Sequence, residues 1–114
     1  MPIGVVLAVI LTLSTGCGED EPETGSEETE IIEVTFEDGA VTPNGERVEV
    51  GVDQPIELVV TADEAGEIHV HADPEQELPY GPGTTTLKLS LREPGVVEVE
   101  SHELELVIVA LQVS

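Results

Sequence analysis

Three histidines are the residues in this sequence whose types and spacing point most clearly to chemistry. His69 and His71 lie in the stretch Glu67-Ile68-His69-Val70-His71-Ala72, and His102 follows the alternating run from Val97 to Ser101. Residues two apart on a strand face the same side, so the first two imidazoles would share one face while the apolar residues between them enter a core. A sheet that brings the two stretches together would gather three imidazoles near one point.

Imidazole nitrogens are common ligands of Cu(II) and Zn(II). We therefore expect a metal site formed by His69, His71 and His102, with Glu67 or Glu100 as an oxygen ligand or as the carboxylate that orients an imidazole. The alternative is a solvated strand face on which the histidines bind nothing. The residue pattern alone leaves these two interpretations open.

The elements that would position these histidines are strands. Valine recurs at every second position in several segments, whereas no long segment repeats apolar residues at helical spacing. Turn residues such as Asp38-Gly39 and Pro43-Asn44-Gly45 separate the segments. The pattern predicts an antiparallel or mixed β-sandwich of about seven strands. Its expected core contains Ile32, Val34, Val50, Leu58, Val60, Ile68, Val70, Leu87, Leu89, Val97, Val99 and Ile108.

Residues 73–83 interrupt the strand pattern with three prolines and two glycines. This composition predicts a loop. Loops on a rigid sandwich commonly carry binding functions, so this segment is where we expect a protein partner to make contact if the domain is an interaction module.

The N-terminal segment is predicted to target the chain to a membrane. Residues 3–13 form an apolar run that has the length of a signal peptide and is too short to span a bilayer. The sequence Leu13-Ser14-Thr15-Gly16-Cys17 resembles the bacterial lipobox, in which the cysteine is lipidated. We expect a signal peptide at 1–16 and a lipidated Cys17 with a disordered acidic tether at 17–30. The alternatives are an ordinary cleavable signal or a short membrane-buried anchor.

Acidic residues dominate the composition. Only three Lys and Arg oppose 25 Asp and Glu, which gives a formal charge of −22. Such a charge repels phosphate backbones, so nucleic acid is not an expected partner. The acidity serves solubility, concentrates cations near the histidines, or does both. Cys17 is the only cysteine in the chain, so an intramolecular disulfide is excluded.

Residues 31–114 resemble the cupredoxin-like domain of bacterial lipoproteins and secreted proteins. The resemblance rests on Asp63, on Glu67-Ile68-His69-Val70-His71 and on the segment from Pro94 to His102. It implies a Greek-key β-sandwich, and it implies that Ser101 stands where a copper protein of this fold carries its cysteine. Blue-copper sites use that cysteine and an axial methionine. No methionine lies downstream, so a blue-copper centre for electron transfer is not expected.

An enzyme is the least expected class. Ser101 and His102 are sequence neighbours that would point to opposite faces of a strand, so they make a poor nucleophile and base. Two functional classes remain. In one, a lipoprotein on the extracytoplasmic face of a bacterial membrane binds copper or zinc through the histidines. In the other, it is a metal-free interaction or presentation module that contacts a protein partner through residues 73–83.

Overall fold

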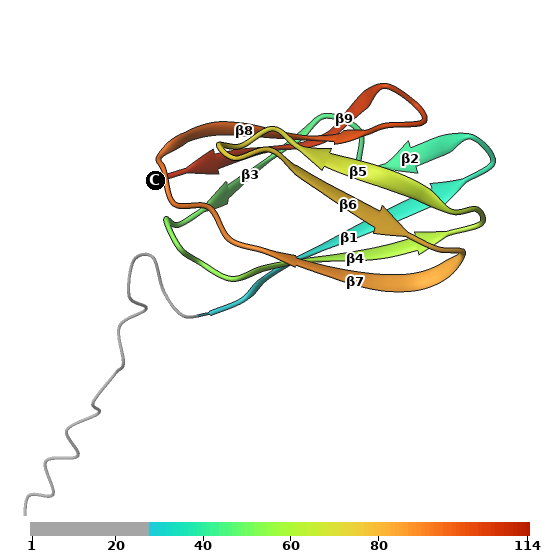
Figure 1. The fold of residues 1–114 in the computed structure, drawn as a ribbon, viewed down its shortest axis with the longest axis horizontal. Helices are drawn as coiled ribbons and strands as arrows, with labels where there is room; N and C mark the ends of the chain where they lie inside the picture. Colours follow the sequence, from blue (N-terminus) through green and yellow to red (C-terminus); the bar gives the residue numbers. More distant parts are fainter. Residues whose placement is uncertain (1–27) are drawn as a thin grey trace, which may run out of the picture.

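The computed structural model describes residues 28–114, and this part of the chain contains nine strands and no helix. Figure 1 shows the strands arranged in two layers. Their bounds are β1 Glu30–Glu37, β2 Ala40–Thr42, β3 Glu46–Val50, β4 Ile56–Ala62, β5 Gly66–Val70, β6 Gln76–Tyr80, β7 Gly83–Leu89, β8 Gly95–Ser101 and β9 Leu106–Val113.

The two layers are mixed sheets. One has four strands in the order β2-β1-β4-β7, and the other has five in the order β3-β9-β8-β5-β6. β1 pairs with β4 in parallel, as β3 does with β9, and the remaining pairs are antiparallel. The all-β sandwich expected from the sequence is confirmed. The two strands beyond the expected seven are β2, which has only three residues, and β6.

The core lies between the sheets, where every second residue of each strand points inward. Of the twelve residues expected there, eleven are buried and Leu87 is half-buried. Phe36 and Tyr80, the two aromatic residues, stack across the sandwich with ring centroids 4.9 Å apart.

Residues 73–83 do not form the single loop that their composition predicts. Residues 76–80 form β6, which pairs with β5 along its whole length, and β7 begins at Gly83. β6 is an edge strand, which is where a residue without an N–H group such as Pro79 is tolerated. The loop interpretation is therefore wrong for residues 76–80.

The first strand begins at the end of the predicted tether, and the domain boundaries expected from the sequence stay a prediction. Glu30 is the first residue of β1, and its N–H donates to the carbonyl of Pro55 over 2.9 Å. The predicted signal peptide, Cys17 and most of the predicted tether lie outside the described residues. Within residues 28–114 there is no helix of the length and apolarity needed to cross a membrane.

Candidate metal centre

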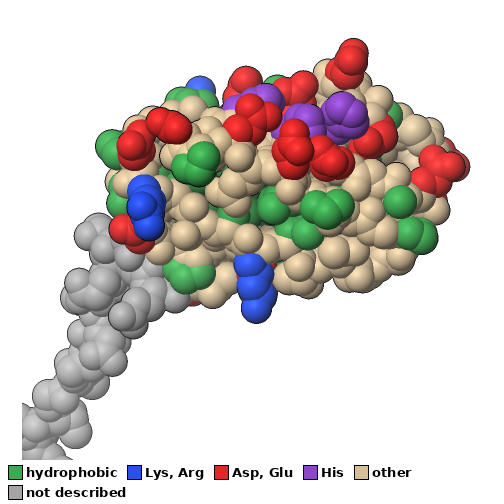
Figure 2. Space-filling model, in the orientation of Figure 1, with side chains coloured by type: hydrophobic (Ala, Val, Ile, Leu, Met, Phe, Trp, Pro, Cys, Tyr) green, Lys and Arg blue, Asp and Glu red, His purple; other side chains and the backbone are tan. Residues whose placement is uncertain are grey.

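His69 lies on the outer face of the five-stranded sheet, on the strand next to the edge strand β6. β5 runs between β6 and β8, and Ile68 and Val70 on its inner side are fully buried. His69 therefore faces outward, with 19% of its side chain exposed. Its neighbours in register are Glu77 on β6 and Glu100 on β8. Figure 2 shows the histidine side chains surrounded by acidic ones.

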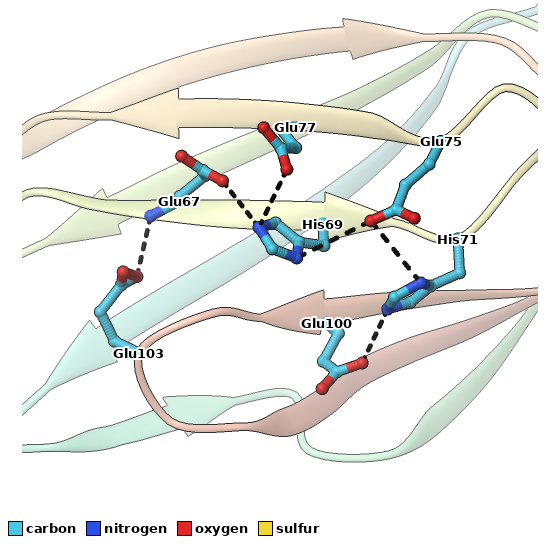
Figure 3. Close-up of polar contacts among 7 residues, drawn as sticks. All are labelled: Glu67, His69, His71, Glu75, Glu77, Glu100 and Glu103. Carbon is cyan, nitrogen blue, oxygen red and sulfur yellow. Dashed lines mark hydrogen bonds and ion pairs between the residues drawn. The ribbon is translucent and has the colours of Figure 1, made fainter.

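Two carboxylates approach the same nitrogen of His69. Its Nε2 lies 2.6 Å from Oε1 of Glu67 and 3.9 Å from Oε1 of Glu77, and Figure 3 shows both side chains on this side of the ring. One ligand atom from each of the three residues lies within 4.8 Å of the other two. Among the residues that the structure describes, this is the one group of three whose spacing suits a metal ion.

The carboxylates also change the protonation of His69. The hydrogen bond to Glu67 is the main cause that raises the pKa of the imidazole above 6.5. Partial burial opposes this shift, and the charges of Glu67, Glu77 and Glu75 add to it. The negative charges that favour the protonated form of this ring would also favour the binding of a divalent cation.

His102 is brought to His69 by the turn between β8 and β9. The two ring centroids are 4.8 Å apart, with a 35° angle between the ring planes. Two hydrogen bonds tie this turn to β5: the N–H of His102 donates to the carbonyl of Glu67 over 3.0 Å, and the N–H of Glu67 donates to Oε1 of Glu103 over 2.8 Å. Through the second hydrogen bond, Glu103 helps to hold the turn that carries His102 against β5.

His71 lies beyond the end of β5 rather than on it. The strand ends at Val70, and the N–H of Ala72 donates to the carbonyl of Val70 over 2.9 Å, a three-residue turn centred on His71. The turn leaves the His69 and His71 ring centroids 6.3 Å apart, with the ring planes at 79°. Nε2 of His71 hydrogen-bonds Oε2 of Glu100 over 2.8 Å.

The structure thus divides the expected ligands into two neighbouring groups. His69, Glu67 and His102 lie together, whereas His71 pairs with Glu100 beside them. Glu75 lies between the groups, with Oε1 3.9 Å from Nδ1 of His69 and 4.0 Å from Nδ1 of His71. A single site built from all three histidines stays a prediction.

Sequence reasoning missed three acidic residues at this site: Glu75, Glu77 and Glu103. The composition of residues 73–83 predicts a loop for the first two, although Glu77 and Pro79 alternate with the more buried Leu78 and Tyr80 as in a half-buried strand. That alternation was the available signal for Glu77. No local pattern singles out Glu103, because its role depends on a contact with β5.

Ser101, at the position where the resemblance places a copper-binding cysteine, points into the sandwich. It is fully buried, and its Oγ accepts a hydrogen bond from the N–H of Leu104 over 3.1 Å. Residues 28–114 contain neither cysteine nor methionine, so this domain has no sulfur ligand. The residues present do not fit a blue-copper centre.

The group on the outer face of β5 offers a different ligand set. It consists of the imidazole of His69 and the carboxylates of Glu67 and Glu77, with the imidazole of His102 close by. Ligands held at about 2.1 Å from a tetrahedral ion are about 3.4 Å apart. The distances from His69 Nε2 to Glu67 and to Glu77 lie on either side of this value, so both are close to the spacing of ligands around such an ion. Nitrogen and oxygen ligands without sulfur suit Zn(II) and Cu(II).

Comparison with known proteins supports the fold. No family model and no curated protein matches the chain. Among solved structures, a reduced Cu(I) form of an amicyanin variant matches with a TM-score of 0.55 at 11% identity, covering 85% of this chain and 95% of amicyanin. A second Cu(I) amicyanin variant matches with a TM-score of 0.56 at 12% identity over the same shares. The fold is cupredoxin-like. At this identity the likeness concerns the cupredoxin-like architecture alone, and the outer-face group is argued from this chain's own residues.

Proposed function

We propose that this protein is a lipid-anchored, extracytoplasmic metal-binding protein whose cupredoxin-like domain holds one Cu(II) or Zn(II) ion on the outer face of β5. The single observation that carries the proposal is the approach of Glu67 and Glu77 to Nε2 of His69. We propose His102 as the fourth ligand, because its ring centroid lies 4.8 Å from that of His69. Glu103 positions His102 through the backbone of Glu67.

The proposed role is to bind or buffer the ion rather than to transfer electrons. Sulfur ligands stabilise Cu(I) and tune the potential of blue-copper sites, and the domain has none. Carboxylates favour the divalent state instead. The acidic surface around the site would concentrate divalent cations near it.

A direct test is to titrate Cu(II) and Zn(II) into residues 28–114 and to record the spectra of the Cu(II) form. We expect one saturable site, and an electron paramagnetic resonance spectrum with nitrogen and oxygen ligation. The absence of saturable binding for both ions, or binding of copper only as Cu(I), would contradict the proposal.

The proposed anchor rests on Cys17 and has its own test. Replacing Cys17 with Ser in the full chain should move the protein from the membrane to the soluble fraction, because the thiol that carries the lipid is gone. A variant that stays fully membrane-bound would mean that the apolar segment at 3–13 is the anchor.

One observation favours the alternative of an interaction module. A groove of about 780 Å³ opens between the β5–β6 and β7–β8 connections, lined by residues that include Asp73, Pro74, Arg92 and Glu93. Asp73 and Pro74 belong to the segment expected to contact a partner. Under this alternative, substitutions in the groove would impair function while substitutions of His69 would not.

A further inference from the structure

β7 leaves one side of the four-stranded sheet open. It pairs only with β4 and ends the order β2-β1-β4-β7, as Figure 1 shows at the lower boundary of the sandwich. The strand has seven residues, from Gly83 to Leu89. Backbone groups on such an edge have no partner within the sheet and form a template for pairing with another strand.

The other three sheet edges are short or acidic, whereas β7 is long and its only charged residue is Lys88. β2 is only three residues long, β3 carries Glu46 and Glu49, and β6 carries Glu77 and also Pro79, which has no N–H group to donate. β7 has the sequence GTTTLKL, with no acidic residue. In a chain of formal charge −22, it is the long edge at which an acidic partner would meet no carboxylate.

We propose that β7 pairs antiparallel with β7 of a second copy of this chain about a two-fold axis at Thr86. The absence of acid fits a partner that is itself acidic, as a second copy is, whereas a basic partner would favour β3 or β6. Two-fold dimers are the commonest homo-oligomers. With the axis at Thr86, the centre of the strand, all seven residues find a partner and the sheet extends to eight strands.

This register places compatible side chains opposite one another. Thr86 lies opposite Thr86 of the partner subunit, and such threonine pairs are favourable across antiparallel strands. Lys88 lies opposite Thr84 of the partner subunit, so the two lysines do not face each other. On the inner side, the half-buried Leu87 lies opposite Thr85 of the partner subunit and loses its remaining exposure at the open edge.

On the outer face, the first acidic residue in the row of Thr86 is Glu33 on β1, two strands away from β7. Val59 on β4 is in register with Thr86, and a row of threonines crosses the sheet through Thr42, Thr35, Thr61 and Thr84. The acidic residue of β4, Glu57, is the cross-strand neighbour of Lys88. Pairing of two copies here therefore brings no uncompensated carboxylates together.

Disulfide trapping in the full chain tests both the partner and the register. Cys17 is replaced with Ser, so that Thr86→Cys supplies the only thiol. Directly opposite residues have Cα atoms about 4.5–5.5 Å apart, within the range of about 4.4–6.8 Å that a disulfide bridges. We expect Thr86→Cys to form a covalent dimer on mild oxidation.

Two variants serve as matched controls. Thr84→Cys lies on the same strand and face, but the proposed register separates it from its copy by about 14 Å along the strands. Thr35→Cys is exposed on the same face of the interior strand β1. Both should form dimers at least tenfold more slowly than Thr86→Cys. If Thr86→Cys forms none, or forms them no faster than either control, β7 does not pair with a second copy in this register.

Discussion

The N–H of His102 donates a hydrogen bond to the carbonyl of Glu67 over 3.0 Å, and so a turn distant in sequence is fixed to the histidine strand. The carboxylate of Glu67 hydrogen-bonds His69, whose ring lies 4.8 Å from that of His102. The residue that orients the first imidazole thus also holds the backbone of the second. Glu67 thus links β5 to the turn between β8 and β9 at the centre of the proposed site.

Replacing Gly66 with Ala should destabilise the domain, because a Cβ at this position would overlap the hydroxyl group and ring of Tyr80 and the carboxylate of Glu103. Tyr80 is buried and stacked on Phe36, so it has little room to move. We expect a loss of about 1–3 kcal/mol in the free energy of unfolding, the usual cost of overpacking.

Gly81→Ala is the matched control for this change. A Cβ at Gly81 meets no atom within 4 Å, and its backbone conformation suits alanine. Urea denaturation measures the free energy of unfolding of both variants, and we expect only Gly66→Ala to lower it. Equal stabilities for the Gly66 and Gly81 variants would show that the region around Tyr80 is less tightly packed than described.

Truncating Val99 to Ala should cost about 2–3 kcal/mol, which combines the lost burial of two methyl groups with the cavity that they leave. Val99 is fully buried on β8 and pairs with Val70 of β5. Val96→Ala on the same strand, where the side chain is 56% exposed, should change stability by less than about 0.5 kcal/mol. Thermal or urea unfolding that gives similar losses for both variants would place the core elsewhere.

The metal-free domain should become less stable as the pH rises from 6 to 8.5. The pKa of His69 is raised in the folded state, chiefly by its hydrogen bond to Glu67. A raised pKa stabilises the fold fully below the unfolded value of about 6.5, and this contribution is lost as the pH rises through the folded value.

Urea denaturation in the presence of a chelator measures this dependence. His69→Gln should flatten it, because the titrating group has been removed, while Glu33→Gln on the opposite sheet should leave it unchanged. A wild-type stability that rises between pH 6 and 8.5 would have the wrong sign for a raised pKa at His69.

The sequence predicted the architecture well because burial has a regular signature on strands. Ile68 and Val70 alternate with Glu67 and His69, and the inward set forms the core as expected. β6 was missed because Pro79 and the nearby glycines indicate a loop, whereas an edge strand tolerates such residues. The short β2 carries too few residues for a period of two to be recognised.

The site was predictable only in part. Period-two spacing correctly predicts that His69 lies on the outer face, but it also predicts that His71 lies beside it on the same strand. The chain instead turns at His71 through a hydrogen bond between Ala72 and Val70, and no residue type in this segment predicts that turn. Glu77 reaches His69 only through the pairing of β5 with β6. Contacts between strands decide which carboxylates surround a histidine, and the residue pattern of one strand does not contain them.

Metal affinity should decrease as the pH is lowered, because protons compete with the metal ion for the imidazole of His69. Because the pKa of this imidazole is raised, the loss on acidification should begin above the value of about 6.5 at which an unperturbed histidine titrates. Zn(II) titrations of residues 28–114 at several pH values measure this. An affinity independent of pH between 5.5 and 8 would exclude an imidazole ligand.

In the proposed site, His69 binds a divalent ion together with Glu67, Glu77 and His102. The most direct test of this site is calorimetric titration of Zn(II) and Cu(II) into residues 28–114 as wild type, His69→Ala, Glu77→Gln, His102→Ala and His71→Ala, with Glu33→Gln as the control. We predict one saturable site that His69→Ala abolishes, that Glu77→Gln and His102→Ala weaken at least tenfold, and that Glu33→Gln preserves. His71→Ala should weaken binding less than His102→Ala, because the His71 ring lies farther from His69. An affinity that is unchanged in His69→Ala would contradict the proposed metal site.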